Sequence, residues 1–274
     1  MLTLDFTGST VLVVGGTSGI NRGIAEAFAK HGAKVAVASR NPQKVAATVA
    51  ALQELGAQAT GFSADVRDYD SVVAGVNQVV AEFGPIDILI SGAAGNFPAM
   101  ADKMSPNGFK SVVEIDLLGT YHVVRAVYPH LRRPGASIIN ISAPQAVVGM
   151  VGQAHVCAAK AGVDMITRTL ALEWGVEGIR VNSIIPGPID GTEGMRRLAP
   201  TPEIHDACRK SVPLKRMGVP EDIANACLFL SSPLASYIHG VILPVDGGWV
   251  LGGYAAVASA MEPLLRVMPA RDKN

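Results

Sequence analysis

The chain has 274 residues, of which 49% are hydrophobic and 17% charged, and its formal net charge at pH 7 is zero. This length suits one large α/β domain or two small ones, and the composition excludes an intrinsically disordered protein. A neutral chain without long acidic or basic runs is not expected to bind nucleic acid or an anionic membrane through bulk electrostatics.

Apolar, β-branched runs alternate with helical patterns along the chain. Strands are expected at 11–14, 35–38, 59–63, 86–90, 137–141, 179–184 and 241–245. Helices are expected at 19–31, 45–55, 71–83, 109–131 and 152–174. Continuous apolar strands separated by helices are typical of a parallel sheet covered on both faces, and right-handed crossovers make such a sheet doubly wound. We therefore predict an α/β fold, a single doubly wound parallel sheet of the Rossmann type, in one domain spanning 1–274.

The segment 187–213 is rich in proline and glycine and is long for a connection between two elements. Long loops of this kind often lie over a binding site, so we predict a mobile substrate loop here. The three cysteines show neither paired nor metal-ligand spacing, which predicts no metal site and a reducing compartment. The first residues are too short and polar for a signal peptide, and no run of about 20 apolar residues predicts a membrane span. These features together favour a cytoplasmic protein.

A glycine-rich stretch, 15–21, follows the first expected strand and opens the first expected helix. Glycines there let a pyrophosphate approach the helix N-terminus, where free N–H groups and the helix dipole attract anions. The second strand ends in Ser39 and Arg40 instead of the acid that usually accepts the ribose hydroxyls of NAD. An arginine fork suits a 2′-phosphate, so we predict NADPH; the alternative is a solvated arginine at a strand end.

With these motifs the chain resembles the short-chain dehydrogenases/reductases, whose fingerprint is T-G-x-x-x-G-x-G. Val14 stands at the position of the threonine and Asn21 at that of the third glycine. Asparagine reaches left-handed backbone conformations at modest cost, so cofactor binding is expected to survive. The resemblance implies the following cofactor-binding residues: Gly15, Thr17, Ser18, Gly19, Ile20, Ser39, Arg40, Asp65, Val66, Gly92, Ala93, Lys160, Pro186, Gly187, Ile189 and Thr192. Within that set, Asp65 and Val66 would contact adenine and Thr192 would hold the nicotinamide carboxamide.

The family's catalytic residues are only partly present. Lys160 is retained, but the tyrosine four residues earlier, which would share its helix face, is Val156. The catalytic serine falls on Ala143 and the assisting asparagine on Asp116. Valine and alanine cannot donate protons, so ordinary ketone reduction by the usual relay is disfavoured.

One branch of the family departs in a similar way, the 2,4-dienoyl-CoA reductases of the peroxisomal type. The resemblance covers nearly the whole chain and is carried by 93–97, 115–116, 155, 159–161, 172–175, 186–194, 196–198 and 232–237. It implies an NADPH-dependent reductase of unsaturated acyl-CoA thioesters, in which hydride adds to a conjugated diene, and a homotetramer. The chain lacks the peroxisomal Ser-Lys-Leu-like tripeptide, which again favours the cytoplasm. The alternatives are a reductase of 2-enoyl-CoA or other acyl thioesters and a catalytically silent cofactor-binding scaffold.

Several groups are candidates for the proton donor in such a site. We expect Asp116 and Lys160 to hold a water near the nicotinamide, with that water or Asp116 donating the proton. His155 is a second candidate acid, although a lone helical histidine is more often packed or on the surface. Gln145 is a candidate donor to the thioester oxygen.

Substrate contacts follow from the resemblance alone. Arg40 and Arg67 would meet the phosphates of CoA as well as NADPH, and Arg197 would clamp a CoA phosphate; for each, the alternative is a solvated surface charge. Phe97, Ser105 and Asn107 would line the channel for the acyl chain and pantetheine.

Overall fold

The structure, a computed structural model, describes residues 4–268 and has one seven-stranded sheet, all of whose strand pairs are parallel. The strands are β1 (Thr10–Val14), β2 (Lys34–Ser39), β3 (Ala59–Ser63), β4 (Ile88–Ser91), β5 (Ser137–Ile141), β6 (Arg180–Pro186) and β7 (Ile242–Val245). Their order across the sheet is β3-β2-β1-β4-β5-β6-β7. The order reverses direction between β1 and β4, which is the switch point where ligands bind in doubly wound sheets. The predicted fold class is confirmed.

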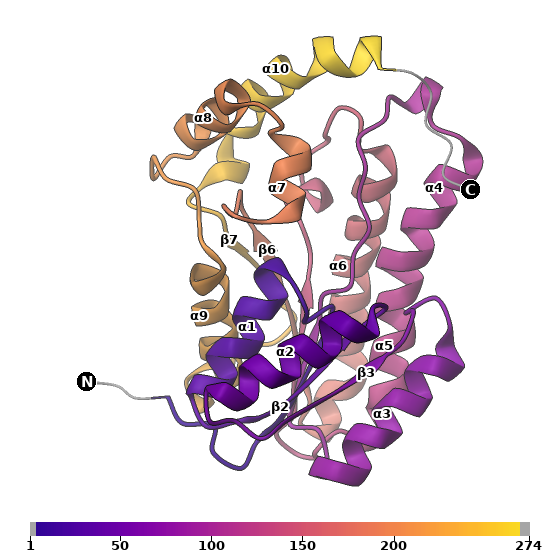
Figure 1. The fold of residues 1–274 in the computed structure, drawn as a ribbon, viewed down its shortest axis with the longest axis vertical. Helices are drawn as coiled ribbons and strands as arrows, with labels where there is room; N and C mark the ends of the chain where they lie inside the picture. Colours follow the sequence, from indigo (N-terminus) through magenta and orange to yellow (C-terminus); the bar gives the residue numbers. More distant parts are fainter. Residues whose placement is uncertain (1–3, 269–274) are drawn as a thin grey trace.

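Helices cover both faces of the sheet (Figure 1). They are α1 (Gly19–Lys30), α2 (Pro42–Glu54), α3 (Tyr69–Phe83), α4 (Pro106–Val113), α5 (Gly119–Val127), α6 (Ala154–Trp174), α7 (Glu193–Leu198), α8 (Pro202–Ser211), α9 (Pro220–Ser231) and α10 (Tyr254–Val267). A π-helical turn at Glu114–Leu118 joins α4 to α5, so the helix expected at 109–131 forms with a widened turn in its middle.

The alternation of side chains along β1 explains the two layers. Val11 and Val13 point into the apolar cluster that includes buried residues of α1, α2 and α9. Leu12 and Val14 point into the opposite cluster, which includes buried residues of α3, α5 and α6. Because successive strand side chains face opposite ways, an unbroken apolar run is what a strand buried on both faces requires.

The segment 187–213 is not a plain loop, because α7 and α8 lie within it. Thr192 and Thr201 cap these helices, accepting hydrogen bonds from the backbone N–H groups of Met195 and Ile204. Pro202 occupies the first turn of α8, where its missing N–H costs nothing. The proline and glycine content that predicted an irregular loop therefore includes helix-start signals, and the mobility of the segment stays a prediction.

Helices α7, α8 and α10 gather at one end of the molecule (Figure 1). Helices α9 and α10 had no counterpart among the helices expected from sequence. Among residues 4–268, no helix combines the length and apolar character that a membrane span requires.

Candidate active site

A cavity of about 390 Å³ opens where the strands β1, β4, β5 and β6 end. Its wall contains Gly19 after β1, Gly92 after β4, Ala143 after β5 and Gly187 after β6. The same cavity is lined by side chains from α7, α8 and α10. The carboxyl edge of the sheet thus supplies one side of the site and the three C-terminal helices another, as expected for a doubly wound fold.

The cofactor side of the cavity is built by the loop after β1. Gly15 has φ +80°, and a Cβ atom there would lie 2.9 Å from the backbone of Gly92 and Ala93, so only glycine fits. Ser18, Gly19 and Ile20 line the cavity at the start of α1, whose first turn carries no acidic residue. This helix start offers unpaired N–H groups to an anion such as a pyrophosphate.

Asn21 takes the place of a glycine in the family fingerprint and binds across the switch point. Its side-chain Nδ2 donates to the carbonyl of Gly92 at 2.7 Å. The asparagine therefore links α1 to the loop after β4 instead of holding them apart.

Two arginines predicted to bind phosphates differ in their surroundings. Arg40 is exposed at the end of β2, and its guanidinium forms no ion pair or hydrogen bond within residues 4–268. Arg67 instead forms a two-pronged pair with Asp65, at 3.0 Å and 2.7 Å, which holds the pKa of that carboxyl below its usual range. Arg40 is free to bind a 2′-phosphate, whereas Arg67 and Asp65 already satisfy each other.

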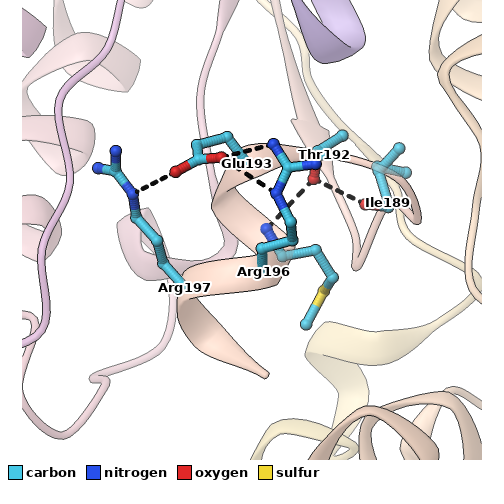
Figure 2. Close-up of polar contacts among 6 residues, drawn as sticks. Ile189, Thr192, Glu193, Arg196 and Arg197 are labelled. Carbon is cyan, nitrogen blue, oxygen red and sulfur yellow. Dashed lines mark hydrogen bonds and ion pairs between the residues drawn. The ribbon is translucent and has the colours of Figure 1, made fainter. Parts of the chain in front are cut away.

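The loop before α7 lies over the cofactor side of the cavity. The Thr192 hydroxyl donates to the Ile189 carbonyl at 2.8 Å and caps α7 (Figure 2). The Thr192 methyl group lies near Gly19. Glu193 pairs with both Arg196 and Arg197 in the same figure. The predicted nicotinamide-side loop thus lies beside the predicted pyrophosphate loop, but the Thr192 hydroxyl is used in capping.

The π-helical turn positions Asp116 in the cavity wall. An α-helix that widens to a π turn carries one extra residue, and such turns are frequent at functional sites. The Asp116 backbone carbonyl accepts a hydrogen bond from Thr120 Oγ1 at 2.7 Å. The side chain is 1% exposed, and its Oδ1 accepts a hydrogen bond of 2.6 Å from the backbone N–H of Gly95.

Asp116 and Lys160 form a buried pair. Lys160 Nζ donates to the carbonyl of Ile141 at 2.9 Å and lies 3.5 Å from Asp116 Oδ2. Burial raises the pKa of Asp116 above its usual value, although the lysine charge and the Gly95 N–H oppose that rise. Among the described residues Lys160 is the one partner given for Oδ2, so this oxygen is the less engaged of the two carboxyl oxygens.

The two positions that lack the family's hydroxyl groups also lie in this wall. Val156 is buried and precedes Lys160 by one helical turn, so the two share a face of α6. Ala143 lines the cavity at the end of β5. At these two positions the wall carries aliphatic groups in place of proton donors.

Gln145 lies in the cavity wall, but its side-chain amide donor already has partners. Its Nε2 donates to Gln153 Oε1 at 3.1 Å and contacts the sulfur of Met150 at 3.2 Å. A thioether sulfur accepts weakly and would be repelled by an amide oxygen, so this contact fixes which way the Gln145 amide points. Gln153 is 1% exposed, and its Nε2 donates to nothing among the described residues. Among these two glutamines of the cavity wall, the amide donor without a partner in the described residues therefore belongs to Gln153, a residue that the sequence did not single out.

His155 lies behind the wall and not in it. The side chain is fully buried and packs edge-to-face on Phe97, with ring centroids 4.6 Å apart. Burial lowers the pKa of His155, although the nearby backbone of Gln153 and Phe97 favours the protonated ring. A neutral, enclosed imidazole suits a packing role better than proton donation.

The residues predicted to contact the substrate are the most scattered of the predicted site residues. Phe97 is buried against His155, and its neighbours Asn96 and Pro98 form the wall instead. Ser105 caps α4 by accepting a hydrogen bond from the N–H of Gly108, and Asn107 is exposed in the first turn of that helix. Arg197 donates to the Asn96 carbonyl at 2.9 Å and pairs with Glu193. None of these four side chains is part of the cavity wall.

Comparisons with known proteins agree with this geometry. The family model described as enoyl-(acyl carrier protein) reductase matches residues 14–250. The peroxisomal 2,4-dienoyl-CoA reductase of Arabidopsis thaliana is 42% identical over 97% of this chain and 93% of its own. That of Rattus norvegicus is 46% identical over 86% and 82%. Both are named as producing (3E)-enoyl-CoA, whereas a probable 2,4-dienoyl-CoA reductase of Bacillus subtilis, 40% identical over 89% and 97%, is named as producing (2E)-enoyl-CoA.

Solved structures share the fold over nearly their whole length. A short chain dehydrogenase from Bacillus anthracis superposes with a TM-score of 0.82 and 39% identity, covering 88% of this chain and 96% of its own. An actinorhodin polyketide ketoreductase variant, solved with NADPH, gives a TM-score of 0.85 and 30% identity over 89% and 99%. The chain therefore belongs to the short-chain dehydrogenase/reductase family, and its relatives include the 2,4-dienoyl-CoA reductases.

Proposed function

We propose that this protein is an NADPH-dependent reductase of 2,4-dienoyl-CoA thioesters. The observation that carries the proposal is the buried Asp116–Lys160 pair in a cavity wall where Val156 and Ala143 replace the family's tyrosine and serine. A carbonyl reductase needs an acid beside the atom that receives hydride. A conjugated thioester does not, because its negative charge develops on a distant oxygen.

The chain's own residues fit the cofactor and the charge that develops. When bound, NADPH supplies the hydride. The first turn of α1 and Arg40 are placed to hold its phosphates, and Lys160 lies beside the position of the nicotinamide ribose in this family. Asp116 Oδ2 is placed to hold a proton, directly or through a water, for the carbon that is protonated. Gln153 Nε2 is placed to donate to the thioester oxygen, where the dienolate charge accumulates.

The raised pKa of Asp116 alters the balance between the candidate proton donors. In water a carboxyl beside a lysine is ionised, which favours a bound water as donor. Here burial is the largest influence on the carboxyl group and favours its neutral form. Asp116 itself is therefore our proposed donor, with a water as the route by which it recovers its proton.

The decisive test is to follow NADPH oxidation with three thioesters in parallel: a 2,4-dienoyl-CoA, a 2-enoyl-CoA and a 3-oxoacyl-CoA. We expect turnover on the dienoyl thioester, and product analysis would then give the position of the remaining double bond. Turnover on the 2-enoyl thioester alone would assign the related enoyl reductase activity. Turnover on the 3-oxo thioester alone would contradict the assigned role of Val156 and Ala143, and turnover on none would favour a silent scaffold.

Arg40 gives a prediction about cofactor choice. Changing Arg40 to alanine is expected to weaken NADPH binding by about ten- to a hundredfold, because one charge-assisted pair with the 2′-phosphate is lost. NADH affinity should barely change, since NADH has no such phosphate. Titration of both cofactors into wild type and variant measures this, with Arg67→Ala as the control, because Arg67 is already paired with Asp65. Equal weakening of both cofactors would remove Arg40 from 2′-phosphate recognition.

An exposed apolar face supports the expected homotetramer. Leu118, Tyr121, Met165 and Leu172 are exposed on the π turn and on α5 and α6, and Leu172 is 83% exposed. Large apolar groups on adjoining helices are typical of an interface between copies of a chain. Light scattering of the purified protein measures the number of chains.

The cytoplasmic location also stays a prediction, since the curated relatives from Arabidopsis and rat are named peroxisomal and that from Bacillus subtilis is not.

A further inference from the structure

One part of the cavity wall is apolar and comes from α10. Val257, Met261 and Leu265 recur every four residues, so they share one face of the helix. All three line the cavity and are at most 9% exposed, whereas Leu264 on the same helix is 43% exposed. Helix α10 thus buries this stripe against the site.

The stripe belongs to a cluster rich in methionine. Its cavity-lining members from other segments are Met150, Met195, Leu198, Cys208 and Trp249. Unbranched, polarisable methionine side chains adapt to flexible apolar ligands. A hydrocarbon tail is the ligand chemistry that this part of the wall fits.

Helix α10 is anchored at its C-terminal end. Lys103 Nζ donates to the carbonyls of Arg266 and Met268, at 2.5 Å and 3.0 Å. Leu265 lies directly above Gly152, where a Cβ atom would approach the leucine Cδ1 to 2.7 Å. The glycine thus leaves the space that the leucine fills, and the helix closes onto the loop between β5 and α6.

The helix also lies outside the part of the chain that defines the family. The family model ends at residue 250, before α10 begins at Tyr254. Residues that bind the cofactor and perform the reaction are expected within the shared part. A helix beyond the part matched by the family model, whose buried stripe faces the site, is suited to adjusting which substrates fit.

We propose that α10 ends the binding site for the acyl tail and so limits the chain length of the substrate, a proposal that builds on the reductase function above. Leu265 and Met261 are the residues against which the tail would stop. The cavity is near the lower end of the range of about 300–1,000 Å³ usual for ligand pockets. Short and medium tails are therefore favoured over long ones.

The first test is a chain-length series of 2,4-dienoyl-CoA thioesters. In the wild type, kcat/KM should rise about fourfold for each methylene that enters the apolar site, then fall once the tail reaches α10. Leu265→Ala should move this maximum to longer chains by at least one two-carbon step. Ala258→Leu, on the cavity side of α10, should move it to shorter chains. Leu264→Ala, on the exposed side, is the matched control and should leave the maximum in place.

A second measurement needs no turnover. Cys208 lines the cavity and is 1% exposed, whereas Cys227 lies on the buried face of α9, in the core and outside the cavity wall. A saturated acyl-CoA of preferred length, at ten times its Kd, should slow alkylation of Cys208 about tenfold and leave Cys227 unchanged. Leu265→Ala should extend this protection to longer saturated chains.

The two measurements separate the possible failures. Protection of Cys208 that depends on chain length and shifts in Leu265→Ala, without reduction of any dienoyl thioester, would support the tail site and overturn the reductase. Reduction of dienoyl thioesters with the same preferred length in wild type, Leu265→Ala and Ala258→Leu would overturn the role of α10 and leave the reductase intact.

Discussion

Changing Asp116 to alanine is expected to lower kcat for a 2,4-dienoyl-CoA by about a thousandfold, within the range found for a lost general acid. The change removes the proposed proton donor and leaves Lys160 without its buried partner. NADPH affinity should stay within about threefold, since no cofactor phosphate depends on this carboxyl group and a threefold change is below 1 kcal/mol. Stopped-flow measurement of hydride transfer, with a separate NADPH titration, tests both expectations.

A second variant, Asp116→Asn, tests the same carboxyl group. The asparagine oxygen keeps the hydrogen bond from Gly95, but its amide neither holds nor releases a transferable proton. We expect it to lose nearly as much turnover as alanine. Glu114→Gln, on the same π turn but outside the cavity wall, serves as the control and should retain the wild-type rate. Near-wild-type turnover in both Asp116 variants would remove the carboxyl group from the mechanism.

The pH dependence of the wild type follows from the same group. A carboxyl whose pKa is raised in the folded protein stays protonated above its usual range and loses the proton as pH rises through the raised value. If the protonated form is the donor, kcat should fall along an alkaline limb that is absent in Asp116→Asn. A limb that persists unchanged in the variant would have to come from another group.

Most of the sheet could be predicted from sequence because most of its strands, unlike β3, are apolar runs with a single interpretation. Val11 to Val14 are buried on both faces, and no helix of that length would bury four consecutive residues. Segment 187–213 was harder, because Pro202 and Thr201 serve equally as loop residues and as the start of α8. Helix α10 has apolar residues four apart, yet only the tertiary structure shows that their common face meets the active site.

The candidate site, like the fold, could be predicted from sequence only in part. Asp116 and Lys160 were recognisable as candidates because they occupy positions of a known motif. Their proximity was expected as well, since both were predicted to hold one water, but the π turn that carries Asp116 was not, because no simple periodicity reveals it. Gln145 and Gln153 show most clearly what could not be predicted from the sequence. Both are glutamines near the same strand end, and only the contact between Gln145 and Met150 distinguishes the engaged donor from the open one.

This arrangement gives a physical reason why Val156 stands where the family has a tyrosine. Val156 and Lys160 share a face of α6, so a tyrosine at 156 would direct its hydroxyl to the oxygen of a ketone, which is bonded to the carbon that receives hydride. In a dienoyl thioester the carbon that receives hydride bears no oxygen, and the negative charge moves along the conjugated system to the thioester oxygen. The donors that we propose are Asp116 on the π turn and Gln153 at the N-cap of α6, and both lie in the cavity wall together with the aliphatic Val156.

Changing Gln153 to methionine is expected to reduce kcat/KM for a 2,4-dienoyl-CoA by about a hundredfold, the usual cost of losing one donor to a developing oxyanion. Methionine is close to glutamine in length and volume, so the cavity wall should keep its shape while the free Nε2 is lost. Binding of a saturated acyl-CoA, which develops no such charge, should weaken far less. Parallel steady-state kinetics and a binding titration distinguish lost transition-state stabilisation from lost packing.

Gln145 provides the matched test, because its Nε2 holds Gln153 through Oε1 and is placed to act only through that residue. Gln145→Met should cost about tenfold in kcat/KM, as one neutral hydrogen bond that orients the donor is lost. The double variant should be no slower than Gln153→Met, since an orienting group has no effect once the oriented donor is absent. Single losses that multiply in the double variant would show Gln145 acting on the substrate by itself, and a wild-type rate in Gln153→Met would leave the thioester oxygen to another donor.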